Sequence, residues 1–94
     1  MKIFQSRSFE KKVKKLFARE KEILDREIKK IAVTPSLGEE KKGDLKGIFV
    51  HKFRIQSIQY LVAYRMVENN LELIMFGTHE NYYKDLKSYL KNRQ

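Results

Sequence analysis

The strongest constraint on the fold is a change of hydrophobic period midway along the chain. In the first third, apolar residues recur every three or four positions, as at Phe9, Val13 and Leu16, which is the period of an amphipathic helix. A second helical pattern runs over residues 19–31, and Pro35 ends it because proline cannot continue a helix. We therefore expect two consecutive helices before any long strand.

Strands are expected at the start of the chain and across its second half. Alternating polarity, or a concentration of β-branched and aromatic residues, marks four segments: residues 2–5, 48–55, 60–67 and 71–76. Asn69 and Asn70 tolerate a positive φ angle and predict a hairpin turn between the last two segments. Before the first helix, Ser6 or Ser8 is a suitable N-cap.

A final helix is expected after residues 77–80, which break the last strand. Its apolar and aromatic residues fall within about a third of the helical wheel: Tyr82, Tyr83, Leu86, Tyr89 and Leu90. The element order is therefore β-α-α-β-β-β-α. We expect a small α+β fold in one domain over residues 1–94, in which an N-terminal helical hairpin and the C-terminal helix pack on one face of a twisted antiparallel sheet.

The composition excludes several classes of protein. The 94 residues include no cysteine and two histidines, which excludes a disulfide scaffold, a thiolate zinc site and a cysteine nucleophile. No apolar run approaches the ~20 residues that a membrane span needs. The chain carries 21 Lys and Arg against 12 Asp and Glu, a formal net charge of +9. These features predict a folded cytoplasmic domain with a polyanionic partner.

Basic residues are expected on one face of the sheet. Successive side chains of a strand point to opposite faces, and the more apolar set should face the helices. This leaves Lys52, Arg54 and Arg65 on the open face, where three cations form a surface suited to phosphate groups. The alternative is that each is an ordinary solvated residue of the sheet.

The two histidines have different sequence contexts. His79 lies between the last strand and the final helix, where it could act as a general acid or base because imidazole titrates near neutrality. The alternative for His79 is an ordinary loop residue or a helix cap. His51 lies between Phe49 and Phe53 and is expected to be partly buried and hydrogen-bonded.

The final helix begins with two tyrosines that have two interpretations. Tyr82 and Tyr83 could stack on a nucleotide base or belong to the core. Their positions on the wheel flank Leu86, so we expect at least one of them to be buried.

These residue types suffice for cleavage of RNA. The 2′-hydroxyl is the nucleophile, so the protein supplies a base, an acid and cations that stabilise charge on the phosphorane. The sequence lacks an obvious carboxylate cluster of the kind that a two-metal nuclease needs. We therefore expect no metal and no cofactor.

The chain resembles the RelE/ParE toxins, the toxin components of bacterial type II toxin–antitoxin modules. The element order and four segments carry this resemblance: residues 43–47, 50–54, 60–65 and 77–86. The most specific part is Gly77-Thr78-His79, which is similar to the ending of YafQ-like toxins, where an aromatic residue follows four positions after the histidine. Here that residue is Tyr83. RelE-type members cleave mRNA in the ribosomal A site, and ParE-type members inhibit DNA gyrase.

The resemblance implies roles for particular residues. Lys52 and Arg54 match strand positions that bind mRNA phosphate, and Lys46 belongs to the matching segment before them. His79 and Tyr83 match catalytic positions. Tyr82 is a possible stacking residue.

The sequence also departs from the family pattern. RelE and YoeB have an arginine at the position of Leu61. Arg65 lies on the same face of the expected strand and is our candidate substitute in catalysis. The extra loop histidines of YafQ-like toxins have no match in residues 55–59.

Three functions remain open from the sequence. The first is a ribosome-dependent mRNA endonuclease, which the combination of Lys, Arg, His and Tyr favours. The second is a gyrase inhibitor without nuclease activity, and the third is a passive nucleic-acid-binding domain. The resemblance also implies a cognate antitoxin, expected as a disordered acidic or amphipathic segment that forms a hetero-oligomer with this chain. For the first function the other partners would be the ribosome and mRNA.

Overall fold

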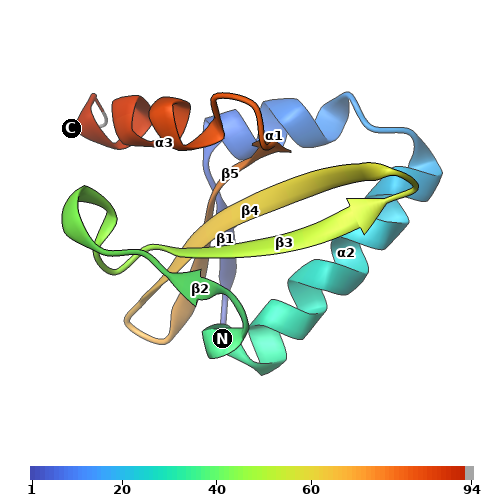
Figure 1. Ribbon diagram of the computed structural model, residues 1–94. Coiled ribbons are helices and arrows are strands. Elements are labelled where there is room, and N and C mark those ends of the chain that lie inside the picture. The colour runs from blue at the N-terminus through green and yellow to red at the C-terminus, as the bar shows by residue number, and fades with distance from the viewer. Residues whose placement is uncertain (93–94) are drawn as a thin grey trace.

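The computed structural model describes residues 1–92 of the chain and has an α+β fold (Figure 1). Its elements in chain order are β1 (Ile3–Gln5), α1 (Arg7–Lys14), α2 (Ala18–Val33), the 3₁₀ helix η1 (Pro35–Leu37), β2 (Glu39–Glu40), the 3₁₀ helix η2 (Gly43–Leu45), β3 (Phe49–Ile55), β4 (Ile58–Val67), β5 (Asn70–Thr78) and α3 (Tyr82–Lys91). The expected fold class is confirmed. The expected order of the main elements is also observed.

The sheet has five strands in the order β1-β5-β4-β3-β2. The pairs β3–β4 and β4–β5 are antiparallel, whereas β1 runs parallel to β5. The expectation of a purely antiparallel sheet was therefore wrong, because the alternation of a strand does not reveal which distant strand it pairs with. The two-residue β2, which pairs with the start of β3, was also not predicted, since glutamates are poor strand formers.

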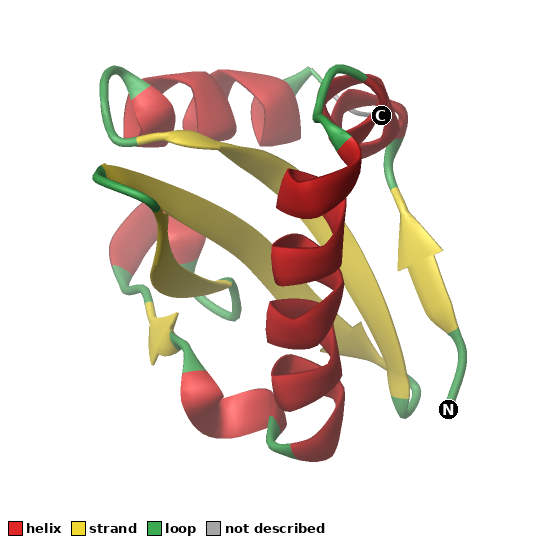
Figure 2. Cartoon of the chain, turned by 90° about the vertical axis from the view of Figure 1, so that its right-hand side faces the viewer, coloured by secondary structure: helices red, strands yellow, loops and turns green. Residues whose placement is uncertain are grey.

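The helices α1 and α2 cover one face of the sheet (Figure 2). Ser6, one of the two expected N-cap residues, begins α1. Its hydroxyl accepts a hydrogen bond from the Phe9 amide at 3.0 Å and donates one to the Ile74 carbonyl at 2.5 Å. This ties the start of the helix to β5. Phe9 of α1 and Leu24 of α2 are buried against the sheet.

The helix α3 packs on the opposite face of the sheet, contrary to the expectation that all helices share one face (Figure 1). Tyr82 and Leu86 of α3 are buried against Leu61, Ala63 and Ile74. The cause is that β4 and β5 are apolar on both faces along part of their length, so both faces need a cover. The open part of the sheet is therefore smaller than expected.

The turn between β4 and β5 lies one residue earlier than predicted. Val67 pairs with Asn70, and the two residues between them, Glu68 and Asn69, have φ angles of 51° and 66°. Two consecutive positive φ angles are typical of the tight hairpin turn that matches strand twist. Asn69 takes part in the turn as expected, while Asn70 begins β5.

A buried tyrosine fixes the loop that leads to β2. The Tyr64 hydroxyl donates a hydrogen bond to the Pro35 carbonyl at 2.6 Å and accepts one from the Gly38 amide at 2.8 Å. A side chain at Gly38 would collide with this hydroxyl, since an added Cβ would lie 2.8 Å from it. The segment after α2 is therefore held on β4 at this point.

Within the described residues, we find no helix that is long and apolar enough to cross a membrane.

Candidate active site

A tight turn between β5 and α3 presents His79 to solvent. The His79 carbonyl accepts a hydrogen bond from the Tyr82 amide at 3.1 Å, and Asn81 adopts a left-handed φ of 56°, which asparagine tolerates. The His79 ring lies edge-on to the ring of Tyr83, with centroids 6.0 Å apart. The two residues predicted for catalysis at this end of the sheet are therefore neighbours.

Tyr82 lies in the core, so the possible stacking role does not fit the structure. Its side chain is 3% exposed, and its hydroxyl donates a hydrogen bond to the Met75 carbonyl at 2.7 Å. Burial raises the pKa of this hydroxyl. The burial of Tyr82 confirms that at least one of the two tyrosines belongs to the core. Tyr83 is half-buried, and its hydroxyl oxygen is buried.

Lys41 joins this group, although sequence reasoning did not single it out. Its ammonium lies 4.9 Å from the centroid of the Tyr83 ring and forms an ion pair with Glu39. The hydrogen bond to Glu39 raises the pKa of Lys41, burial opposes this, and the Tyr83 hydroxyl raises it further. The ammonium is therefore a permanent charge beside Tyr83. The sequence signal was only the Lys41-Lys42 pair in a glycine-containing loop.

Lys52 and Arg54 are exposed and share a face of β3, as predicted. Lys52 pairs with Leu61, which in turn pairs with Gly77, so Lys52 and Gly77 are two strand spacings apart, about 10 Å. Lys52 also contributes, after Lys41, to lowering the pKa of Glu39. Along the strands, Lys52 is therefore level with Gly77, two residues before His79.

Arg54 lies farther along β3, near the β3–β4 turn. Its guanidinium donates a hydrogen bond to the Ser57 carbonyl at 3.3 Å. Arg54 pairs with Gln59, one residue beyond the Tyr60–Thr78 pair that ends the β4–β5 ladder. His79 follows Thr78, so Arg54 is level with His79 along the strands.

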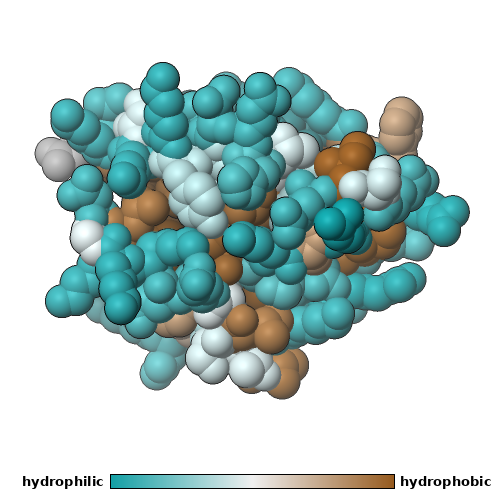
Figure 3. Space-filling model, in the orientation of Figure 1, coloured by the Kyte–Doolittle hydropathy of each residue, from teal (hydrophilic) through white to brown (hydrophobic). Residues whose placement is uncertain are grey.

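Lys46 belongs to a hollow next to this group. The hollow, of about 280 Å³, lies between β2 and η2 and is lined by Glu40, Lys41, Lys42, Gly43 and Lys46. Lys41 lines this hollow and also contacts the ring of Tyr83, which in turn contacts the ring of His79. In Figure 3, polar side chains cover most of this face, and apolar surface shows between α3 and the segment of β2 and η2.

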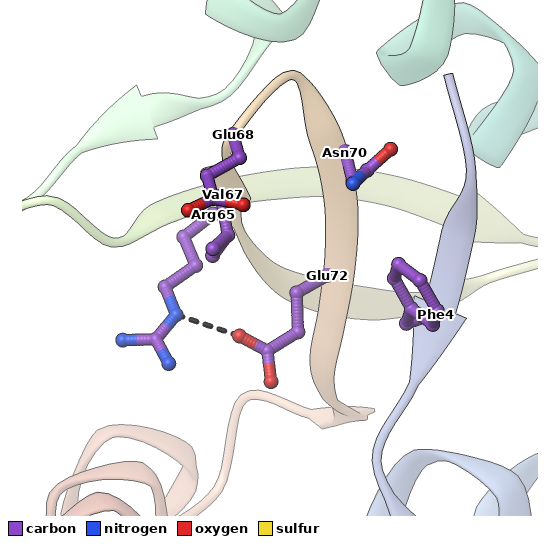
Figure 4. Close-up of a pocket in the computed structure, with 6 residues that line it drawn as sticks. All are labelled: Phe4, Arg65, Val67, Glu68, Asn70 and Glu72. Atoms are coloured by element: carbon purple, nitrogen blue, oxygen red, sulfur yellow. Dashed lines mark hydrogen bonds and ion pairs between the residues drawn. The ribbon is translucent and has the colours of Figure 1, made fainter.

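The structure does not bring Arg65 to His79. Tyr60 of β4 pairs with Thr78, the residue before His79. Arg65 lies five residues farther along β4, about 16 Å from Tyr60. Its Nε donates a hydrogen bond to Glu72 Oε1 at 2.6 Å, beside a pocket at the β4–β5 hairpin (Figure 4). The reason is the direction of β4, which carries Arg65 away from the β5–α3 turn. Arg65 therefore does not replace the missing arginine at position 61.

His51 has a structural environment, as expected. It is half-buried, its ring stacks on that of Phe53, and its Nε2 lies 2.8 Å from Glu27 Oε1 on α2. A carboxylate can only accept, so Nε2 carries the proton and donates. Burial raises the pKa of Glu27, but the hydrogen bonds from Lys30 and His51 outweigh this effect. The pKa of Glu27 is therefore lower than its usual value of 4.5.

Replacing Glu27 with glutamine is expected to lower the free energy of unfolding by about 1–2 kcal/mol at neutral pH, because His51 and Lys30 lose a charged acceptor. A carboxylate with a lowered pKa stabilises the fold above its unfolded pKa, and this contribution is lost as the pH falls through the folded value. Urea unfolding at about pH 7 and about pH 3.5 should therefore show a difference between wild type and E27Q that shrinks in acid. A difference that grew in acid would contradict this role.

The arrangement offers an exposed imidazole and several cations, with the ring of Tyr83 between His79 and Lys41. An exposed imidazole can accept and donate a proton near neutral pH, and ammonium and guanidinium groups stabilise a phosphorane. Among the described residues, no three His, Asp or Glu side chains are grouped so as to hold a metal ion.

The fold is that of known toxins. It matches a mutant of E. coli RelE in the free state, with a TM-score of 0.74 and 17% identity over 99% of this chain and 97% of that one. A chain of the RelBE toxin–antitoxin complex of E. coli matches with a TM-score of 0.66 and 16% identity, over 82% of this chain and 94% of that one. A YoeB/ParE toxin from Agrobacterium tumefaciens matches with a TM-score of 0.67 and 27% identity, over 84% of this chain and 99% of that one. The comparison with curated proteins gives no match.

The sequence places the chain in a family. A family model described as the ParE-like toxin of type II bacterial toxin–antitoxin systems matches residues 3–87. The chain belongs to this family, and it is a type II toxin of the RelE/ParE superfamily. The YafQ-like character of its ending stays a prediction.

Proposed function

We propose that the chain is a ribosome-dependent mRNA endonuclease that inhibits translation. The observation that carries the proposal is the contact between exposed His79 and Tyr83, with Lys41 on the Tyr83 ring. Lys52 and Arg54 lie exposed on β3, which is two strands away from β5 in the sheet. A gyrase inhibitor without nuclease activity has no need of a proton-transfer group among cations.

In the proposed reaction, the 2′-oxygen of a nucleotide forms a bond to the adjacent phosphorus and the bond from phosphorus to the 5′-oxygen breaks. A base takes the proton of the 2′-hydroxyl, and an acid gives a proton to the leaving 5′-oxygen. His79 serves in one of these two steps. Tyr83 positions the imidazole through its ring, and Lys52 and Arg54 bind the phosphates.

The experiment that tests this function is inducible expression in bacteria. The proposal expects translation arrest and new 5′ ends in mRNA, read by primer extension. Intact mRNA with inhibited supercoiling of plasmid DNA would instead establish the gyrase inhibitor. That second function has one observation in its favour, the ParE-like description of the family.

We also propose that a cognate antitoxin binds this chain. Membership of a toxin–antitoxin family supports it, and the net charge of +9 favours an acidic partner. Co-expression with the small reading frame adjacent to its gene should restore growth.

A further inference from the structure

The ion pair between Lys41 and Glu39 lies beside the ring of Tyr83. The Lys41 side chain is 20% exposed and rests on the Tyr83 ring, whereas the Glu39 side chain is 71% exposed. The lysine is thus positioned by the fold, and the glutamate reaches it from the solvent side. An exposed ion pair of this kind contributes little to stability.

The charges around Lys41 favour an anion larger than one carboxylate. Lys41, Lys42 and Lys46 all line the hollow of about 280 Å³, and Glu40 is the acidic residue in its lining. Glu39 pairs with Val50, and Lys52 lies two residues farther along β3 on the same face as Val50. Three lysines therefore line the hollow, and Lys41 among them is the one that the Glu39 carboxylate neutralises.

We propose that Lys41 and the hollow beside it form a phosphate subsite for single-stranded RNA, and that Glu39 is an internal competitor which the RNA phosphate displaces. The inference rests on the proposed function for the identity of the ligand. It adds Lys41 and Glu39 to residues that the sequence had indicated. The subsite lies beside Tyr83, so it would hold a phosphate next to the one being cleaved.

Displacement makes a specific prediction about charge. Glu39 repels a phosphate chiefly by holding Lys41, so removal of its charge should strengthen RNA binding only when Lys41 is present. Each phosphate contact contributes about 0.7 to the dependence of log affinity on log salt for a single strand. Lys41→Ala should therefore weaken the salt dependence by about 0.7. Lys41→Arg should restore it.

The probe is a fluorescent, fully 2′-O-methylated oligoribonucleotide, which cannot be cleaved by attack of a 2′-hydroxyl. Its affinity is measured by anisotropy over a range of salt concentrations. The variants are Lys41→Ala, Lys41→Arg, Glu39→Gln and the double variant Glu39→Gln/Lys41→Ala. Lys29→Ala is the matched control, since Lys29 is an exposed lysine of α2, on the other face of the sheet.

The proposal expects Glu39→Gln to bind about three- to tenfold more tightly than wild type, and to change nothing in the Lys41→Ala background. Equal tightening in both backgrounds would overturn it, as would a Lys41→Ala slope no different from that of Lys29→Ala. Because the probe is not cleaved, the result is independent of the reaction. Absence of mRNA cleavage by wild type would contradict the proposed function and leave this measurement to decide the subsite.

Discussion

Replacing His79 with alanine is expected to lower the rate of the proposed mRNA cleavage by about 10²–10⁴-fold, because the proposed reaction would lose one of its two proton-transfer groups. The rate is measured as cleavage by purified toxin on ribosomes programmed with a defined mRNA. Since His79 is exposed, the free energy of unfolding should change by less than about 0.5 kcal/mol. Loss of activity would therefore not reflect loss of folding.

The control for this prediction is His79→Gln, which keeps hydrogen-bonding groups but cannot transfer a proton near neutral pH. We expect it to be as inactive as His79→Ala. Full activity of H79Q would show that His79 acts through hydrogen bonding alone, and full activity of both variants would remove His79 from the site.

Replacing Leu86 with alanine is expected to lower the free energy of unfolding by about 2–5 kcal/mol, the cost of a cavity in a well-packed core. Leu86 is fully buried between α3 and the sheet, against Leu61 and Ile74. The same change should impair cleavage, because α3 carries Tyr83 and its packing fixes the distance to His79. Urea unfolding followed by circular dichroism measures the loss of stability.

Lys87→Ala is the matched variant, since Lys87 is the exposed neighbour of Leu86 on the same helix. It should change stability by less than about 0.5 kcal/mol. A loss below about 1 kcal/mol for Leu86→Ala would mean that α3 contributes little to the core on this face.

The sequence was most informative where the signal is local. The change of hydrophobic period predicted the helices and the main strands. Ser6 and Ser8 were the candidates for the start of α1, of which Ser6 is the N-cap, and Pro35 predicted the end of α2. Alternation along β3 correctly placed Phe53 and Lys52 on opposite faces, with Phe53 packed against α1 and α2. These features depend on residues within a few positions of one another, so a single sequence contains them.

The sequence was least informative where distant segments meet. Nothing in residues 2–5 shows a parallel pairing with β5, and nothing in α3 shows which face of the sheet it covers. The contact of Lys41 with Tyr83 joins a loop to a helix, and the distance of Arg65 from His79 depends on strand register. Tertiary packing determines all of these.

We have proposed that His79 and its neighbours cleave mRNA on the ribosome. The most direct test of this function is primer extension on a defined mRNA incubated with purified toxin, with and without ribosomes. New 5′ ends are expected only when ribosomes are present, and they should be lost with His79→Ala. Two results would contradict the proposed function: mRNA that stays intact on ribosomes incubated with wild-type toxin, or undiminished cleavage by His79→Ala.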